Sequence, residues 1–240
     1  MQNHKIELSI IIPSYNEENI KEDTLRKLEV VETLGIPYEV IIVSGDKKYK
    51  KALGFLSSKG VKVYYPEDSK GKGYNIFYGL ERASGRYVLY IDADNDIDPS
   101  IIGVLYQTMR NGKCDMVYAN KYNRNSIVKR GFVRDLSSRI INLAIHFLFH
   151  IDVKDTQTGA KIYKREVLIE VEKRRKVKIP GFAFEVEIAI LLREMGAKVC
   201  EVPVKIHPSG KTNVAISNVI AFFRDLLKLK RVYIRSQGQT

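Results

Sequence analysis

The sequence has 240 residues, 45% of them hydrophobic, and its 40 Lys and Arg outnumber 28 Asp and Glu to give a net charge of +12. This composition excludes a disordered chain and is ample for one α/β domain of above-average size. The basic excess favours phosphate-bearing partners, namely nucleic acid, nucleotides or lipid headgroups, although a lysine-rich solvated surface explains the charge equally well.

Cysteine spacing and hydropathy indicate the cellular compartment and whether the chain spans a membrane. Cys114 and Cys200 lack a CxxC spacing, so we expect neither a disulfide framework nor a zinc site, and a reducing cytoplasm is the natural compartment. Residues 1–12 show no secretory signal pattern. The longest apolar stretch, residues 140–149, is shorter than the roughly 20 residues that a membrane span needs, so no span is expected.

Strands and helices are expected to alternate through the first half of the chain. Apolar runs predict strands at 8–12, 38–45, 61–65, 86–94 and 114–120, and amphipathic segments predict helices at 17–34, 47–60, 71–85 and 100–112. This rhythm indicates βαβ units and a mostly parallel sheet, which binds ligands beyond the carboxyl ends of its strands. Polar segments at 13–17, 44–46 and 92–98 follow three of these strands and should converge on one edge.

The second half is more basic. Residues 119–139 contain six Lys or Arg and a single acid, Asp135. Helices are predicted at 136–150, 182–196 and 214–233, and a strand at 197–206. The helices at 136–150 and 214–233 combine apolar stripes with basic borders, a pattern that suits either an anionic membrane surface or packing on the sheet.

Four aspartates stand together at the end of strand 86–94: Asp92, Asp94, Asp96 and Asp98. In an extended chain, Asp92 and Asp94 project from the same side. Mg²⁺ and Mn²⁺ prefer a few carboxylates together with the phosphates of a substrate. A polar turn that caps the next helix explains Asp98, which precedes Pro99, but not Asp92. The cluster therefore predicts a divalent metal that carries a nucleotide diphosphate.

Two other segments favour a nucleotide. Lys72, between two glycines, opens a helix where a phosphate could bind, although the spacing fits no known phosphate loop and also suits a plain turn. In the segment 13–18, Tyr15 could pack on a base or ribose and Glu17 could accept a ribose hydroxyl. The same residues fit an ordinary helix start with Asn16 as its cap.

The chain resembles the glycosyltransferase family-two enzymes of GT-A fold in five segments that occur in order: IIPSYNEE, YEVIIV, GKGYNIFYGLERASGRYVLYIDADNDIDP, DTQTGAKIYKREV and FAFEVEIAILLREMGAKVCEVPV. The similarity covers about residues 6–215 and is strongest to the dolichyl-phosphate mannose and dolichyl-phosphate glucose synthases. It implies an α/β fold with a Rossmann-like, mostly parallel sheet flanked by helices. On this basis we expect a catalytic domain at 1–213, with a nucleotide-sugar half at 1–119 and an acceptor half at 120–213. A basic amphipathic helix and tail follow at 214–240.

The residues and the resemblance together give four sets of candidate site residues. The nucleotide-sugar set is Pro13, Tyr15, Glu17, Asp46, Lys72, Asp92, Ala93, Gln157, His207 and Lys211. The catalytic set is Asp92, Asp94, Asp155 and Glu187, and the metal set is Asp94 and Asp96. The acceptor-phosphate set is Lys121, Arg124, Arg130, Arg134 and Ser138.

The chain departs from the family pattern at several positions. Where the family has Val-Asp-Asp-Gly-Ser, this chain reads Val43-Ser44-Gly45-Asp46, which shifts the base-reading carboxylate to Asp46. The late loop carries its phosphate-binding lysine as Lys211. His207 is either a helper for the diphosphate or metal, or an ordinary strand-end histidine. Asp96 stands where the family often has Gln.

The resemblance implies a metal-dependent inverting transferase that uses Mg²⁺ or Mn²⁺. It would move a hexose, with GDP-mannose favoured over UDP-glucose as donor, to a polyprenyl or dolichyl phosphate. We expect peripheral association with the cytoplasmic face of a membrane, and a separate membrane-anchoring subunit is compatible with this. The alternatives are a transferase that uses a sugar hydroxyl as acceptor, a nucleotidyltransferase, and a nucleic-acid-binding module. The last two lack their sequence signatures here, so no nucleic-acid partner is expected.

Overall fold

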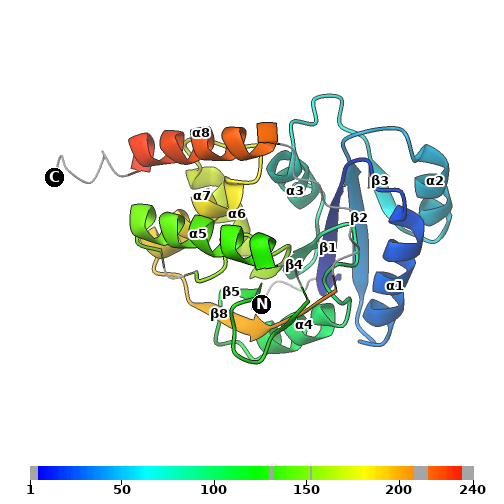
Figure 1. Ribbon diagram of the computed structural model, residues 1–240. Helices are drawn as coiled ribbons and strands as arrows, with labels where there is room; N and C mark the ends of the chain where they lie inside the picture. The colour runs from blue at the N-terminus through cyan, green and yellow to red at the C-terminus, as the bar shows by residue number, and fades with distance from the viewer. Residues whose placement is uncertain (1–4, 130–131, 152, 208–215, 234–240) are drawn as a thin grey trace.

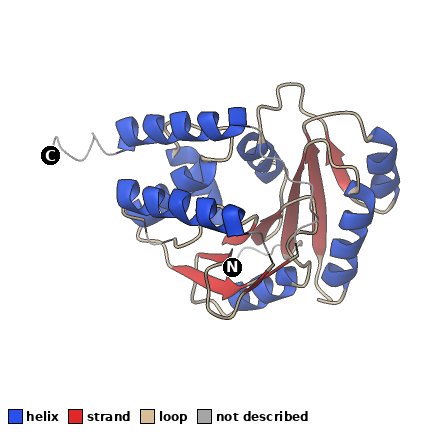
Figure 2. Ribbon diagram, in the orientation of Figure 1, coloured by secondary structure: helices blue, strands red, loops and turns tan. Residues whose placement is uncertain are grey.

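The computed structural model describes residues 5–129, 132–151, 153–207 and 216–233, without the side chains of 132–137 and 216–219. Helices cover both faces of a central twisted sheet (Figures 1 and 2). The fold class expected from the sequence, an α/β fold with a mostly parallel sheet, is confirmed.

The first half alternates strands and helices as expected. Its elements are β1 (Leu8–Ser14), α1 (Ile20–Glu32), β2 (Tyr38–Ser44), α2 (Lys50–Ser58), β3 (Lys62–Tyr64), α3 (Lys72–Leu80), β4 (Tyr87–Ile91), α4 (Ile101–Arg110) and β5 (Met116–Asn120). The second half contains β6 (Ile127–Val128), α5 (Phe132–Phe149), β7 (Ala160–Lys164), α6 (Arg165–Arg174), α7 (Phe184–Glu194), β8 (Val199–Pro203), β9 (Lys205–Ile206) and α8 (Ile216–Tyr233). The sequence did not predict β6, β7 or α6, and the strand expected at 197–206 is divided into β8 and β9.

The main sheet has the strand order β3-β2-β1-β4-β7-β5-β8. Strand β7 lies between β4 and β5 and runs antiparallel to both, whereas the other neighbouring strands are parallel. Because β7 is reversed, its first residue, Ala160, pairs with Ile91, the last residue of β4. The segment that precedes β7 therefore reaches the sheet edge at which the parallel strands end.

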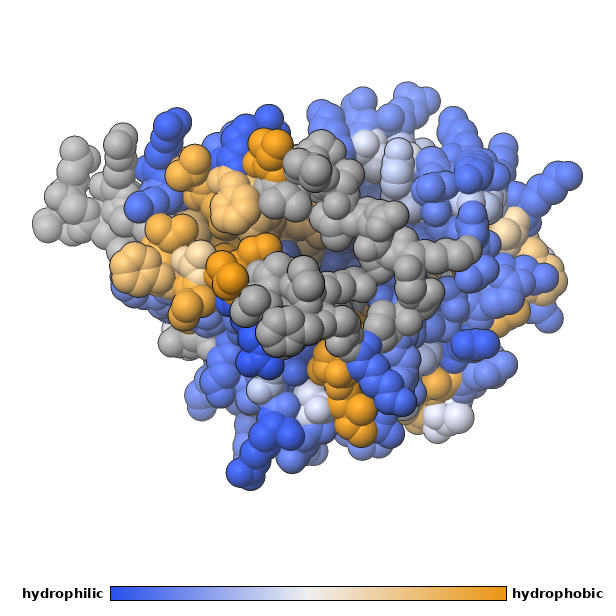
Figure 3. Space-filling view, viewed as in Figure 1, coloured by the Kyte–Doolittle hydropathy of each residue, from blue (hydrophilic) through white to orange (hydrophobic). Residues whose placement is uncertain are grey.

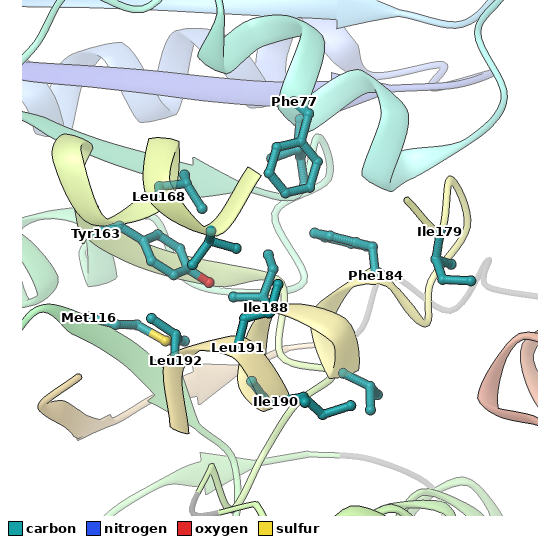
Figure 4. Packing of buried hydrophobic residues seen from close by; sticks show 14 of the residues in the cluster. Phe77, Met116, Tyr163, Leu168, Ile179, Phe184, Ile188, Ile190, Leu191 and Leu192 are labelled. Carbon is teal, nitrogen blue, oxygen red and sulfur yellow. The ribbon is translucent and has the colours of Figure 1, made fainter. Parts of the chain in front are cut away.

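Two hydrophobic cores hold the layers together, one on each face of the sheet. Leu8, Ile10 and Ile12 of β1 pack with residues of α1, α2 and α4, whereas Ile11 packs on the opposite face with residues of α3 and α7. In the second core, the rings of Phe77 and Phe184 meet edge to face at 6.3 Å between centroids (Figure 4). This contact fixes α7 against α3.

A disulfide joins Cys114 and Cys200, so the expectation against a disulfide is wrong. The two cysteines are 86 residues apart in sequence and meet because β5 and β8 are neighbours, with Val117 opposite Cys200. Local spacing carries no trace of such a long-range contact. The argument from cysteine usage for a reducing compartment consequently has no support.

Within the described part of the chain, no helix combines the length and the apolarity that a membrane span requires.

The buried carboxylate of Glu39 connects the first residues of neighbouring strands. Glu39 of β2 accepts hydrogen bonds from the Ser9 hydroxyl at 2.6 Å, from the backbone amide and hydroxyl of Ser84, and from Lys62 Nζ at 2.6 Å. Burial raises the pKa of this carboxyl, but the hydrogen bonds from Lys62, Ser9 and Ser84 outweigh it and lower the pKa to about 2. The ionised form is therefore part of the native structure.

We predict that Glu39→Gln lowers the free energy of unfolding at pH 7 by about 1–3 kcal/mol, because the amide cannot accept from Lys62 and Ser9 as the carboxylate does. The native pKa is depressed, so the contribution of Glu39 is complete above its ordinary pKa of 4.5 and is lost as the pH falls from there to about 2. Urea unfolding across this pH range should show the gap between wild type and variant closing in acid. The exposed Glu32→Gln serves as control. A gap that stays constant down to pH 2 contradicts the prediction.

Candidate active site

Five segments meet at one edge of the main sheet. The ends of β1, β2, β4 and β5 lie there because these strands are parallel, and the start of β7 lies there because β7 is reversed. The Asp92 amide donates to the Gly159 carbonyl at 2.9 Å, which joins the aspartate cluster directly to the segment 155–159. The expected convergence of the three polar segments is therefore observed, with residues 155–159 added to it.

Carboxylates crowd this edge. Burial, followed by the charges of Asp94 and Asp92, raises the pKa of Glu17 to about 7. Burial, followed by the charges of Asp92 and Asp96, raises the pKa of Asp94 to about 6. Like charges held this close in a half-buried place need a positive partner, and a cation is the natural one.

Asp92 is paired with Lys72. The Lys72 ammonium lies 2.8 Å from Asp92 Oδ1 and 3.7 Å from Glu185 Oε1. Burial lowers the pKa of Lys72, but the charges of Asp92 and Glu185 outweigh it, so the pKa lies well above its ordinary value and the lysine stays charged. Glu185 also accepts from Lys161 Nζ and from the Tyr90 hydroxyl, each at 2.9 Å. Lys72 therefore faces carboxylates of the site in this structure.

Gly159 makes room for Asp92. A Cβ atom built at Gly159 would overlap the Asp92 carboxylate. The backbone of Gly159 is not in the left-handed region, so the requirement for glycine here is one of space alone. Asp92 can therefore take this position only because residue 159 has no side chain.

The basic loop after β5 is anchored by Asp155. Asp155 is fully buried, and it accepts from Lys121 Nζ at 2.8 Å, from the Lys121 amide at 3.0 Å and from the Thr158 hydroxyl. Burial raises the pKa of Asp155, but the charge of Lys121 and these hydrogen bonds bring it below its ordinary value. The Tyr122 hydroxyl, next along the chain, is 2.9 Å from the Ser138 hydroxyl of α5.

The loops after β1 and β2 are joined through Asp46. Its carboxylate accepts the Asn16 amide at 2.7 Å and the Lys48 amide at 2.8 Å. The ring of Tyr15 is 71% exposed and lies so close to Gly45 that a Cβ atom there would sit 3.0 Å from it. Tyr15 therefore presents an open aromatic face, while the carboxylate of Asp46 is engaged with the backbone.

The site can be tested against the expected metal. Within the ranges that the structure describes, no group of three or more His, Cys, Asp or Glu is arranged to hold an ion. Mg²⁺ and Mn²⁺ need only one or two carboxylates when substrate phosphates and water complete their shell. Asp94 and Asp96 supply oxygen ligands of this kind, and the His207 amide donates to the Asp96 carbonyl at 2.8 Å, which brings His207 to the same segment. The donor set fits a hard divalent ion.

Glu187 belongs to a different network. It is fully buried and accepts from Arg175 Nε, from the amides of Val177, Lys178 and Ile179, and from the Tyr233 hydroxyl. These contacts pin the loop 175–179 and α8. The same loop supports α3, since the Pro180 carbonyl accepts the Tyr74 amide at 3.2 Å. Glu187 thus influences the site indirectly, by supporting the helix that begins with Lys72. Its catalytic role stays a prediction.

The remaining candidates fall into two groups. Pro13 is a buried residue one position before the end of β1, and Ala93 is buried beside Asp92. Gln157 is half-buried between Asp155 and Gly159, and Arg124 is exposed in the basic loop. Arg130 and Lys211 lie outside the described residues, as does the side chain of Arg134.

Sequence reasoning missed two buried lysines. Lys27 of α1 donates to the loop 93–95, and Lys161 of β7 donates to the carbonyls of Thr156 and Thr158 at 2.9 and 2.8 Å. The only local signal was their place in apolar patterns, Lys27 on the buried face of a helix and Lys161 between Ala160 and Ile162.

Comparison with known proteins shows the family. The model of the glycosyl transferase family 2 matches residues 9–172, which is more than half of the chain. The chain belongs to glycosyl transferase family 2.

Among curated relatives, it is 25% identical to the glycosyltransferase AglD of Haloferax volcanii over 98% of its own length but only 37% of that protein. It is 27% identical to a dolichol-phosphate mannosyltransferase of Pyrococcus furiosus, covering 94% of this chain and 64% of the relative. It is also 27% identical to a dolichyl-phosphate beta-glucosyltransferase, ALG5D, of Trichomonas vaginalis, over 95% of this chain and 74% of that one. The chain thus spans between about a third and three quarters of these relatives.

Solved structures of transferases share the fold. Mannosyl-3-phosphoglycerate synthase from Rubrobacter xylanophilus superposes with a TM-score of 0.72 at 20% identity, covering 98% of this chain and 76% of that one. The mannosyltransferase PcManGT from Pyrobaculum calidifontis, solved with GDP-Man and Mn²⁺, has a TM-score of 0.57 at 16% identity, covering 92% of this chain and 64% of that one. These likenesses confirm the GT-A-like architecture expected from the sequence.

We predict that Gly159→Ala lowers transferase activity by roughly 100-fold while the protein stays folded, because the new methyl group displaces the Asp92 carboxylate and parts it from Lys72. Initial rates and thermal unfolding should be measured together. Gly54→Ala is the matched control, since a Cβ atom there meets nothing within 4 Å. Wild-type activity in Gly159→Ala would show that the position of Asp92 does not matter.

Proposed function

We propose that the protein transfers a hexose from a nucleotide sugar to a polyprenyl phosphate, with inversion at the anomeric carbon. The observation that carries the proposal is that an acidic segment and a basic loop meet at one edge of the main sheet. The acidic segment 92–96 suits a metal-bound diphosphate, and the basic loop that begins at Lys121 suits a second anion. The names of the curated relatives from Pyrococcus and Trichomonas support this acceptor class.

A phosphate acceptor removes the need for a general base. Its oxygen is already anionic at neutral pH, so it can attack the anomeric carbon while the bond to the diphosphate breaks and the leaving nucleoside diphosphate takes the electron pair. The protein must then hold two anions in line and offset their repulsion. We assign the acceptor phosphate to Lys121 and Arg124 with the Ser138 hydroxyl nearby, and we extend the set to Arg130 and Arg134.

The donor would lie across the ends of β1, β2 and β4. We assign the base or ribose to Tyr15 and Glu17, and the diphosphate to the segment at Asp92 and Ala93. Asp94 and Asp96 would hold Mg²⁺ or Mn²⁺, which when bound neutralises the charge that develops on the leaving diphosphate. Gln157, His207 and Lys211 complete the donor set. Lys72 acts by holding Asp92, and Asp155 by holding Lys121.

The sugar and base are the finer part of the proposal. Curated mannosyl and glucosyl relatives match this chain at the same identity. We favour GDP-mannose because the segments DMVYANKYN, YKREVL and GFAFEVEI resemble the mannose synthases, and we keep UDP-glucose as the second candidate because DTQTG resembles the glucose synthases. Asp46 stays in the donor set as the carboxylate for the base, since it accepts the Asn16 amide and so lies next to the loop that carries Tyr15.

A membrane surface is the natural partner for this acceptor, since its tail stays in the bilayer. Exposed apolar side chains follow an i, i+3, i+7 pattern on both candidate helices: Ile140, Leu143 and Phe147 on α5, and Ile220, Phe223 and Leu227 on α8. Figure 3 shows apolar side chains gathered over this part of the molecule. Arg139, Arg224, Lys228, Lys230 and Arg231 are exposed on the same helices. We propose peripheral binding through this face, on the cytoplasmic side.

The test of the function is a panel of GDP- and UDP-sugars with a polyprenyl phosphate, with and without Mn²⁺, in which lipid-linked product is measured. We predict product with one donor class and a loss of about 100-fold in Asp94→Asn, whose amide neither binds the metal nor offsets its charge as well. Ser100→Ala, in an exposed position at the start of α4, is the control. Transfer only to a soluble sugar hydroxyl, or an undiminished rate in Asp94→Asn at low Mn²⁺, rejects the proposal.

We predict that the protein binds anionic vesicles at low salt and that binding weakens steeply as salt rises, since each basic group contributes on the order of 1 kcal/mol near such a surface. Charge reversal at Lys228, Lys230 and Arg231 should reduce co-sedimentation. The same change at Lys47, Lys50 and Lys51, at the far end of the molecule by α2, should reduce it much less (Figure 1). Equal losses in both triple variants would assign binding to net charge alone.

A further inference from the structure

Lys27 is an enclosed lysine beneath the acidic segment. It lies on α1 with only 2% of its surface exposed, on the helix face that also buries Ile20, Thr24, Leu28 and Val31. An aliphatic residue would fill such a position without the cost of desolvating an ammonium group. A charged group in this position needs hydrogen-bond acceptors to offset the cost of its burial.

All three protons of the ammonium have acceptors in three consecutive residues. Lys27 Nζ donates to the Ala93 carbonyl at 2.9 Å, to the Asp94 carbonyl at 2.9 Å and to Asn95 Oδ1 at 2.7 Å. A longer contact of 3.5 Å joins Nζ to the Asp23 carbonyl of the same helix, and with only three donors the ammonium is fully engaged. The lysine thus binds the backbone of the loop, and it forms no hydrogen bond to the carboxylates of Asp92 or Asp94 among these contacts.

A second residue of α1 strengthens the attachment. The Asn95 side chain, which accepts from Lys27, donates to the Asp23 carboxylate at 2.9 Å. Asp23 and Lys27 are four residues apart and so lie on the same face of the helix. Helix α1 therefore holds Asn95 at two points.

The loop is held from the other side by the acceptor half. The Asp92 amide donates to the Gly159 carbonyl, and the Asp98 amide donates to the Lys205 carbonyl. Between these points, the carbonyls of residues 93 and 94 are turned toward α1. With these two peptide groups fixed, the directions in which the side chains of Asp92 and Asp94 leave the backbone are fixed as well.

We propose that Lys27 is a positioning residue that fixes the backbone of residues 93–95 and so directs the carboxylates of Asp92 and Asp94 toward the bound nucleotide and metal. This inference rests on the proposed function for its ligand, while the placement of Lys27 does not depend on it. Lys27 itself need not touch substrate.

Charge and positioning predict opposite results for metal binding. Removal of a positive charge close to the carboxylates should by itself tighten Mn²⁺ binding. Loss of the fixed backbone should weaken it, because the ligands are then no longer preorganised. Weaker Mn²⁺ binding in Lys27→Met therefore reports positioning specifically.

The experiment compares Lys27→Met and Asn95→Ala with wild type by three measurements. Hydrogen exchange, which needs no ligand, should show faster exchange of the Asp96 amide, which donates to Asp94 Oδ1, with unchanged exchange in β4. Mn²⁺ binding in the presence of GDP or UDP should weaken by about 10-fold or more. Sugar transfer should fall mainly in kcat, with little change in KM for the lipid phosphate.

Lys62→Met is the matched control, because it removes a lysine that pairs with Glu39 at the other end of the sheet and so reports stability loss alone. Asn95→Ala keeps the test open if Lys27→Met does not fold, since Asn95 is on a half-buried loop. Unchanged exchange at residues 93–96, or Mn²⁺ binding that is equal or tighter in the variants, overturns the inference. If wild type transfers no sugar but these two readouts change as expected, the proposed function fails and the role of Lys27 stands.

Discussion

The constraint on which the site depends is the mutual repulsion of carboxylates at one edge of the sheet. Three carboxylates and one carboxylate-bearing loop are matched by enclosed or nearly enclosed lysines: Lys72 for Asp92, Lys121 for Asp155, Lys161 for Glu185, and Lys27 for the loop 93–95. Buried ion pairs contribute little net stability, because desolvation offsets most of their attraction. Their value here is in geometry, since each pair allows a single arrangement of the loop that it holds.

These pairs connect elements that are distant in sequence. Lys72 begins α3, and α3 is supported at its start by the Pro180 carbonyl in the loop that Glu187 holds. Phe184 packs between α3 and the sheet, beside Tyr90. The position of Asp92 therefore depends on α3 and α7 as well as on β4 and Gly159. Substitutions far from the acidic segment can act on it through this route.

The sequence predicted most of the first half of the fold because each of its elements carries its own periodicity. The apolar runs of β1, β2 and β4 and the polar residues that follow them were sufficient to predict that these three loops meet at one edge of the sheet. The short strand β7 was missed because Ala160 to Lys164 is buried on both faces and shows no alternation. Helix α6 was missed because it is rich in charge and buries only Leu168 and Val171.

The contacts within the site could not be predicted from spacing. Lys27 meets residues 93–95, Lys121 meets Asp155, and Cys114 meets Cys200 only after the sheet has assembled. The aspartate cluster and the family resemblance supplied Asp92, Asp94 and Asp155, and both Lys72 and Lys121 were candidates for binding phosphate. Their pairing with Asp92 and Asp155 was not predicted. For Glu187, the resemblance suggested a place beside the sugar, whereas the structure shows this carboxylate bonded to the loop 175–179 and to Tyr233 of α8.

The central place of β7 has a consequence for the order in which the molecule can form. Strands β4 and β5 are made early in synthesis, yet the strand that pairs with both begins only at residue 160. Until then both strands have an open edge, which is the part of a sheet most prone to pair with other chains. The nascent first half would be vulnerable to aggregation during this interval, and assembly of the site would have to await the second half. Insertion of β7 joins β4 to β5 and brings residues 155–159 to the acidic edge, while the other edge of β5 stays open until β8 is made.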